Sequence, residues 1–235
     1  MIRRRLIRQA ANAISFSTLI LGVTSIVLSI EGHLMWAGAL ILLGVLTDAM
    51  DGAVARATQS GSEFGLQLDS LADATCFGAG SFAFAYQYLR LNELSSAESL
   101  LLLLPVPIAG VFRLARFNVM AVKTGQELST MGLTAPLGAG ILVLAGLSGL
   151  HYEAGLFLPA MAILLPLTVA VLMASRIEFP SLWLVTRRKK TTVVVLGLGT
   201  LLSFQLSPQL VSLTVMMSYL GYGVARAGFG LTNRG

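Results

Sequence analysis

Long apolar segments occupy almost the whole sequence and are separated only by short polar breaks. A helix needs about 20 mostly apolar residues to cross the hydrocarbon core of a bilayer. Eight segments approach this length, at roughly 12–30, 34–56, 64–89, 98–121, 131–150, 155–175, 190–206 and 209–228. We therefore expect an all-α polytopic membrane protein with about eight transmembrane helices, forming a single domain over residues 1–235.

Charged side chains are scarce, which excludes several other classes of protein. Only 11% of the residues are charged and 55% are hydrophobic, whereas about 25% of a typical soluble domain is charged. A disordered chain would need the opposite balance. The single cysteine, Cys76, excludes an internal disulfide framework and a cysteine-based zinc site. We expect Cys76 to be a small packing residue between helices.

The basic residues indicate how the helices are oriented. Lys and Arg collect in cytoplasmic loops, and a cytoplasmic N-terminus followed by eight spans places 15 of the 16 basic residues on that side, with only Arg90 outside. Both termini are therefore expected in the cytoplasm. A six-span arrangement with two re-entrant or interfacial segments fits this distribution less well. The net charge of +5 then reflects orientation, and we expect no nucleic-acid partner.

Four of the 11 acidic residues lie inside apolar segments, where charges are rare. They are Asp48, Asp51, Asp69 and Asp73. Each ionisable group at membrane depth costs roughly 2.5–3.5 kcal/mol by insertion scales, so such residues are functional unless they are paired. The alternative is a purely structural role, in which these acids form buried ion pairs with Arg56, Arg113 and Arg116. A cation pathway in a transporter would also use buried acids, and a non-catalytic membrane scaffold is a third possibility.

The spacing of these acids places them on two helix faces. Asp48 and Asp51 are three residues apart, and Asp69 and Asp73 are four apart, so each pair shares a face. The eight residues 57–64 can turn the chain so that the two faces meet. Clustered carboxylates need countercharge, and oxygen ligands suit Mg²⁺ or Mn²⁺. Two such ions would serve phosphate chemistry.

Small residues and an arginine accompany the first pair of acids. Gly52 and Ala55 remove bulk from the helix, which lets a ligand approach the backbone. Arg56 can make paired hydrogen bonds to phosphate. This framework, completed by Gly65 on the next segment, favours a phosphate ligand over the ion path of a transporter.

Residues 48–73 fit the pattern D-x2-D-G-x2-A-R-x8-G-x3-D-x3-D at every specified position. This pattern resembles the motif of the CDP-alcohol phosphatidyltransferases. The resemblance implies a membrane enzyme that moves a phosphatidyl group from a CDP-linked lipid to an alcohol, releases CMP and uses two Mg²⁺ or Mn²⁺ ions. It implies that Asp48, Asp51, Asp69 and Asp73 bind the ions, and that Asp73 also acts as the general base.

The same resemblance implies which residues meet the CDP group. They are Asp48, Gly52, Ala55, Arg56, Gly65 and Asp69, with Asn12 and Ser15 of the first span near the cytidine. Asn12 has an alternative role as the N-cap of the first helix.

Further stretches resemble the branch of the family that uses serine as the acceptor. They are residues 68–73 with Phe77-Gly78, residues 113–118, and residues 172–177 before Pro180-Ser181. The resemblance implies CDP-diacylglycerol and L-serine as substrates, with phosphatidylserine and CMP as products. Glycerol 3-phosphate, an inositol phosphate or choline as acceptor, or an archaeal ether CDP-lipid as donor, are the alternatives within the same chemistry.

Two arginines are candidates for binding the acceptor. Arg113 and Arg116 share a helix face, and an arginine fork suits a carboxylate or phosphate. We expect one of them to contact the serine carboxylate or the lipid phosphate, with Asn118 nearby. The alternative is that both anchor the helix at the membrane surface. The resemblance also implies a homodimer. The topology derived from the basic residues places Arg56 and the loop after it on the cytoplasmic side, so we expect an active site that faces the cytoplasm in a protein of the cell membrane.

Overall fold

The structure is a computed structural model that describes residues 2–58, 63–124, 131–151, 164–177 and 221. Side chains are described for residues 12–49, 63–120, 131–150, 164–177 and 221. Within these ranges the chain is helical and contains no strand. The predicted all-α class is therefore confirmed for the part of the chain that is described.

The helices follow the predicted apolar segments closely. They are α1 (Ile2–Ile30), α2 (Leu34–Thr58), α3 (Glu63–Asp73), η1 (Ala74–Gly80), α4 (Ser81–Leu91), α5 (Ser96–Leu103), α6 (Pro105–Thr124), α7 (Ala135–His151) and α9 (Leu165–Ala174). The main difference is at the start, because α1 begins at Ile2 rather than near residue 12. The predicted spans at 190–206 and 209–228 lie outside the described residues.

Local sequence signals explain where several helices begin and end. Gly32 has a positive φ of 82° in the turn between α1 and α2, a conformation that glycine adopts without a steric penalty. At the start of α5, Ser95 and Glu98 form a reciprocal capping box. Pro105 starts α6, since its ring fits the first turn of a helix but not the interior.

The segment predicted as one span at 64–89 is a single helical run made of three parts. It consists of α3, η1 and α4, and η1 is a π-helix. The Ser81 hydroxyl at the end of η1 donates a hydrogen bond to the Phe77 carbonyl. Segments of π-helix are rare and are often found beside functional sites. Here the π-helix begins directly after Asp73.

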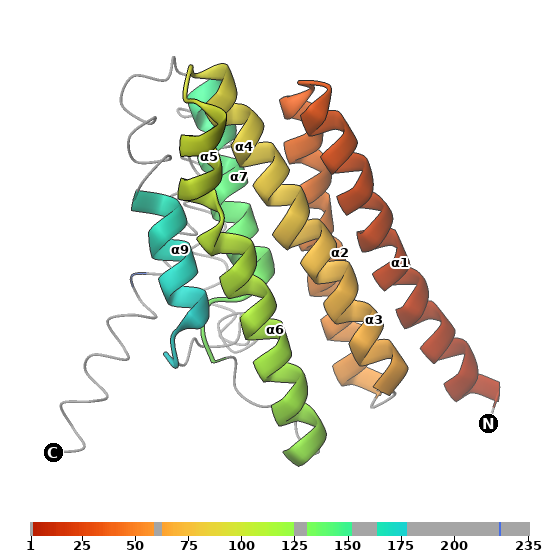
Figure 1. The fold of residues 1–235 in the computed structure, drawn as a ribbon. Coiled ribbons are helices and arrows are strands. Elements are labelled where there is room, and N and C mark those ends of the chain that lie inside the picture. Colours follow the sequence, from red (N-terminus) through yellow and green to blue (C-terminus); the bar gives the residue numbers. More distant parts are fainter. Residues whose placement is uncertain (1, 59–62, 125–130, 152–163, 178–220, 222–235) are drawn as a thin grey trace, which may run out of the picture.

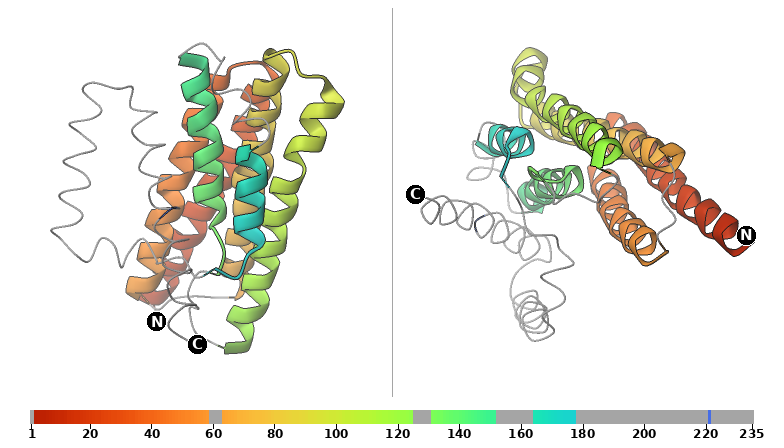
Figure 2. Two further views of the ribbon diagram at one scale, coloured as in Figure 1. Left: turned by 90° about the vertical axis from the view of Figure 1, so that its left-hand side faces the viewer. Right: turned by 90° about the horizontal axis from the view of Figure 1, so that it is seen from below.

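The described helices run side by side as a bundle (Figure 1). In the end-on view of Figure 2, α9 and α1 lie at opposite sides of the bundle, with α7 and α2 between them. Helix α1 packs against α2, α3 and η1, while α6 packs against η1 and α9. The run α3–η1–α4 therefore lies between α1 and α6, which places its inward side near the middle of the bundle.

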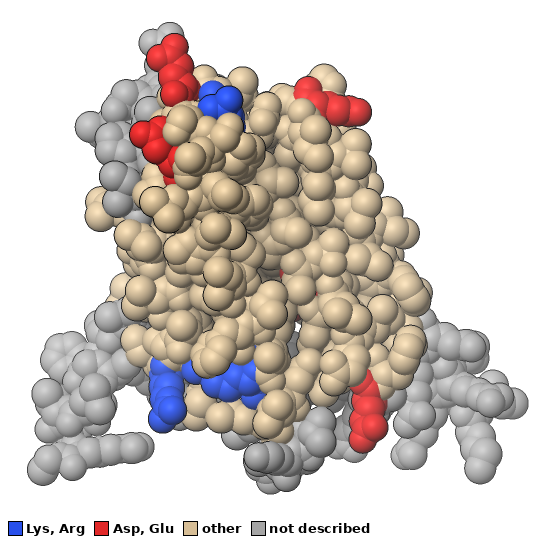
Figure 3. Space-filling model, in the orientation of Figure 1, with Lys and Arg blue, Asp and Glu red and all other residues tan. Residues whose placement is uncertain are grey.

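The outer surface of the bundle agrees with a membrane location. Segments Asn12–Ile30 and Ser96–Met120 are long and apolar enough to cross a membrane, and three shorter apolar helices accompany them. Large apolar side chains such as Ile20, Trp36 and Leu101 point outward. In Figure 3 the described charged residues gather at the two ends of the face shown, and its middle is almost entirely uncharged.

Candidate functional site

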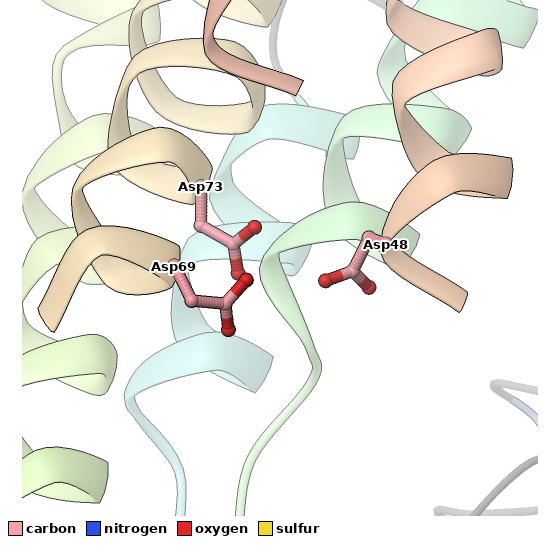
Figure 4. A group of neighbouring side chains, drawn as sticks. All are labelled: Asp48, Asp69 and Asp73. Atoms are coloured by element: carbon pink, nitrogen blue, oxygen red, sulfur yellow. The ribbon is translucent and has the colours of Figure 1, made fainter. Parts of the chain in front are cut away.

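Three of the four predicted acids converge between two helices. Asp48 projects from α2, and Asp69 and Asp73 project from α3 toward it (Figure 4). One carboxylate oxygen from each of the three lies within 4.8 Å of the others. Asp73 is buried, whereas Asp48 and Asp69 are half-buried. The spacing argument is therefore confirmed for these three residues, because both helix faces do meet.

The acids line a pocket with a volume of about 130 Å³. Its other lining residues are Ser70, Arg113, Leu114, Phe117, Thr134 and Pro136. A single water needs roughly 10–15 Å³ by a comparable measure, so there is room for hydrated ions or a small polar group. The described lining carries three carboxylates and one guanidinium, which gives the pocket an excess of negative charge when all are ionised.

The remaining residues of the 48–73 motif are only partly described. Asp51, Gly52, Ala55 and Arg56 lie on α2, which continues to Thr58, but their side chains are outside the described residues. Gly65 lies in the first turn of α3, one helical turn before Asp69. The first part of the motif therefore lies on α2 as far as Thr58 and the last part on α3, and the roles of these side chains stay predictions.

The first helix passes close to the acids. The hydroxyls of Thr18 on α1 and Thr47 on α2 are 3.0 Å apart, and Thr47 precedes Asp48. Ser15, one turn before Thr18, is 3% exposed. Because α1 already begins at Ile2, Asn12 lies inside the helix, and the alternative N-cap role for Asn12 is wrong.

Arg113 faces the acidic pocket from α6. Its side chain is buried, with 7% of its surface exposed, and it lies within electrostatic reach of Asp73 and Asp48. The Nε atom has no hydrogen-bond partner among the described residues. Among the described residues that line the pocket, Arg113 is the only basic one. It is therefore placed to meet an anionic group that enters the pocket.

Arg116 is engaged elsewhere, although it is only one turn further along α6. Its guanidinium donates hydrogen bonds to the carbonyls of Ala174 at 3.1 Å, Ser175 at 2.8 Å and Met131 at 3.2 Å. These bonds hold the C-terminal end of α9 against the segment 131–134, which leads into the pocket wall. A cation at a helix C-terminus also interacts favourably with the helix dipole.

Asn118 links α6 to α3 through its side-chain amide. Its Oδ1 accepts a hydrogen bond from the Ser70 hydroxyl at 3.1 Å, and its Nδ2 donates one to Gln67 Oε1 at 3.4 Å. Ser70 itself lines the pocket. Asn118 therefore lies beside the pocket, close to the position expected for it.

The three carboxylates fit a divalent cation. Hard cations such as Mg²⁺ and Mn²⁺ prefer oxygen ligands, and the described group offers three of them in close reach. The pocket also leaves room for water, which Mg²⁺ retains when it binds. The predicted ion ligands Asp48, Asp69 and Asp73 are thus compatible with such a site.

Sequence reasoning missed the opposite wall of the pocket. Thr134 and Pro136, from the segment before and at the start of α7, complete it together with Leu114 and Phe117. The segment is shaped by Gly132, which has a positive φ of 79° and donates its N–H to the Ile177 carbonyl. A glycine and a proline close to a span boundary were the available signal, since such residues mark turns.

Fold and pocket together define a class: a helical protein with an apolar outer surface and an inner pocket whose acids suit metal-dependent phosphate chemistry. The sequence profile described as CDP-alcohol phosphatidyltransferase matches residues 8–174. The chain belongs to the CDP-alcohol phosphatidyltransferase family.

Individual relatives are similar over 60% to 92% of the chain. A CDP-diacylglycerol–serine O-phosphatidyltransferase of Helicobacter pylori is 34% identical over 224 residues, which cover 92% of this chain and 89% of the relative. An archaetidylserine synthase of Methanothermobacter thermautotrophicus is 34% identical over 68% of this chain and 64% of its own length. A CDP-diacylglycerol–serine O-phosphatidyltransferase of Methanocaldococcus jannaschii is 36% identical over 60% of this chain and 62% of its own.

Proposed function

We propose that the protein transfers a phosphatidyl group from CDP-diacylglycerol to the hydroxyl of L-serine, giving phosphatidylserine and CMP. The observation that carries this proposal is the pocket in which Asp48, Asp69 and Asp73 meet Arg113. The relatives named as serine transferases support serine as the acceptor. The archaetidylserine synthase of Methanothermobacter thermautotrophicus is also named for a serine-containing product, so serine is the feature that the names of these relatives share.

In this proposal the chain provides a base, ion ligands and an anion contact. The serine hydroxyl oxygen attacks the lipid-bearing phosphorus, and the Asp73 carboxylate takes the proton of that hydroxyl. The bond from that phosphorus to the bridging oxygen breaks, and CMP leaves with the electron pair. Asp48, Asp51, Asp69 and Asp73 would hold two divalent ions, which would supply positive charge to offset that of the diphosphate and of the CMP leaving group.

Arg113 is the residue that we assign to the serine carboxylate or the lipid phosphate. Its burial and its place in the pocket support this assignment, since a guanidinium binds either group through paired hydrogen bonds. We assign the CDP group to Gly52, Ala55, Arg56 and Gly65, together with Ser15 and Asn12 of α1.

We further propose that the pocket opens toward the cytoplasm, in a protein with eight spans and both termini on that side. The positive-inside distribution of Lys and Arg supports this orientation. The acyl chains of the donor then stay in the bilayer while the nucleotide and serine arrive from water. We propose a homodimer on the family resemblance alone.

A direct assay tests the proposal. Purified protein in detergent micelles should convert CDP-diacylglycerol and radiolabelled L-serine to phosphatidylserine and CMP in the presence of Mn²⁺, and excess chelator should abolish the reaction. Parallel reactions contain glycerol 3-phosphate, inositol phosphate or choline in place of serine. Turnover with one of these and none with serine would overturn the assignment of the acceptor.

A further inference from the structure

Cys76 lies where three helical segments come into close contact, immediately beside the carboxylates. It belongs to the π-helix η1, is fully buried, and is three residues after Asp73. On one side is Gly22 of α1, and on the other is Gly44 of α2, four residues before Asp48. Residues three or four apart share a helix face. The contact between Gly44 and Cys76 is therefore about one helical turn from the place where Asp48 faces Asp73.

The absence of side chains at both glycines makes this contact possible. A methyl group added at Gly44 would lie 2.8 Å from the Cys76 Sγ and 3.4 Å from Phe77. A methyl group at Gly22 would lie 2.6 Å from the Cys76 Cα and 2.9 Å from its N atom. The sulfur therefore fills the gap toward α2, whereas the backbone of η1 itself approaches α1.

We infer that Gly44 and Cys76 act as a spacer pair that sets the separation between Asp48 and the two acids of α3. Non-bonded heavy atoms are at their best separation near 3.5–4.0 Å. With the Sγ of Cys76 held in its fully buried position, relief of the 2.8 Å overlap would move α2 and η1 apart by up to roughly 0.7–1.2 Å. Ion–ligand distances are held to within about 0.2 Å, so a displacement of this size is large for a shared ion.

This inference deepens the proposed function, because it rests on the binding of divalent ions by the three carboxylates. The test measures ion binding in the absence of substrate. Purified protein is titrated into Mn²⁺, and the electron paramagnetic resonance signal of the free Mn²⁺ reports how much ion stays unbound. Substitutions at residues that hold metal ligands in position typically weaken metal affinity by roughly 10–100-fold. We expect Gly44→Ala to raise the Kd for Mn²⁺ by about tenfold or more.

The decisive variant combines two substitutions. Removal of the sulfur in Cys76→Ala eliminates the 2.8 Å overlap and leaves the added methyl group with only the 3.4 Å contact to Phe77. Gly44→Ala/Cys76→Ala should therefore regain most of the Mn²⁺ affinity that Gly44→Ala loses. Gly22→Ala offers a contrast, since its overlap is with backbone atoms and the Cβ of Cys76, all of which alanine keeps, and Cys76→Ala should not rescue it.

Gly78→Ala is the matched control within the same π-helix. A methyl group there meets no atom within 4 Å, so the Kd should stay at the wild-type value. Thermal unfolding and size-exclusion chromatography of each variant identify any that fail to fold. Should Gly44→Ala fold poorly, Mn²⁺ binding by the double variant still decides the matter.

The possible results separate this inference from the proposed function. If wild-type protein does not bind Mn²⁺, the proposed metal site is wrong. If wild-type protein binds but Gly44→Ala binds equally well, the spacer role is wrong while the proposed function stands. A double variant that folds and binds no better than Gly44→Ala would also overturn the spacer role.

Discussion

Replacement of Arg116 by alanine should weaken the fold while leaving the preference for a carboxylate-bearing acceptor intact. Arg116 makes three hydrogen bonds to the carbonyls of Ala174, Ser175 and Met131. Hydrogen bonds to a charged group contribute roughly 1.5–3 kcal/mol each. One half-buried guanidinium makes all three, so their effects are not additive. We expect Arg116→Ala to lower the free energy of unfolding by about 2–4 kcal/mol.

The assay compares L-serine with serinol, which keeps a hydroxyl and the ammonium but lacks the carboxylate. If Arg116 only positions the pocket wall, Arg116→Ala should reduce kcat/KM for both acceptors by the same factor. If Arg113 binds the serine carboxylate rather than the lipid phosphate, Arg113→Ala should instead lower the serine-to-serinol ratio of kcat/KM by about tenfold or more, which corresponds to the loss of a charge-assisted hydrogen bond. Equilibrium unfolding in detergent provides the stability measurement for both variants.

Two results would refute this reasoning. Arg116→Ala could unfold like the wild-type protein, which would show that the three hydrogen bonds contribute little. Alternatively, Arg116→Ala could lose activity toward serine alone, which would assign the acceptor carboxylate to Arg116. The conservative variant Arg116→Lys serves as a control, because it keeps the charge but not the planar fork, and it should recover only part of the lost stability.

Further predictions concern the base, the pocket wall and the α3–α6 contact. Asp73→Asn should lower kcat by at least about 10²-fold, since it removes the general base; near-normal turnover would exclude that role. Gly132→Ala should destabilise the fold more than Gly32→Ala in thermal unfolding, because both have positive φ but only the methyl group at Gly132 meets a carbonyl, that of Met173, at 2.5 Å. Equal losses would contradict the predicted clash. Ser70→Ala should lower the free energy of unfolding by about 1 kcal/mol through loss of the bond to Asn118; an unchanged value would show that this bond contributes nothing measurable.

Local patterns in the sequence were sufficient to predict most of the described helices and the meeting of the acids. The length of the apolar segments predicted the helices, and spacings of three and four residues placed Asp69 and Asp73 on one face opposite Asp48. Both arguments depend only on residues close together in the chain. They succeed because helix geometry converts short spacings directly into positions in space.

Features that depend on distant parts of the chain could not be predicted in this way. Arg113 and Arg116 are the same residue type on one helix face, so the sequence does not distinguish their roles. Their contacts in the fold do, because Arg113 lies beside the acids and Arg116 binds the end of α9. Thr134 reaches the pocket through a turn at Gly132. The π-helix after Asp73 likewise has no periodic signal in the sequence, because the apolar pattern continues through it.

The acids of the pocket are carried on helices rather than on loops, and this has a consequence for ion binding. Asp69 and Asp73 belong to a helical run that continues without a break to Leu91, and Asp48 lies within α2. The backbone at these positions is already ordered before a ligand arrives, so little conformational entropy remains to be lost when the carboxylates converge on a cation. Preorganisation of this kind leaves more of the intrinsic ligand–ion attraction available as net affinity.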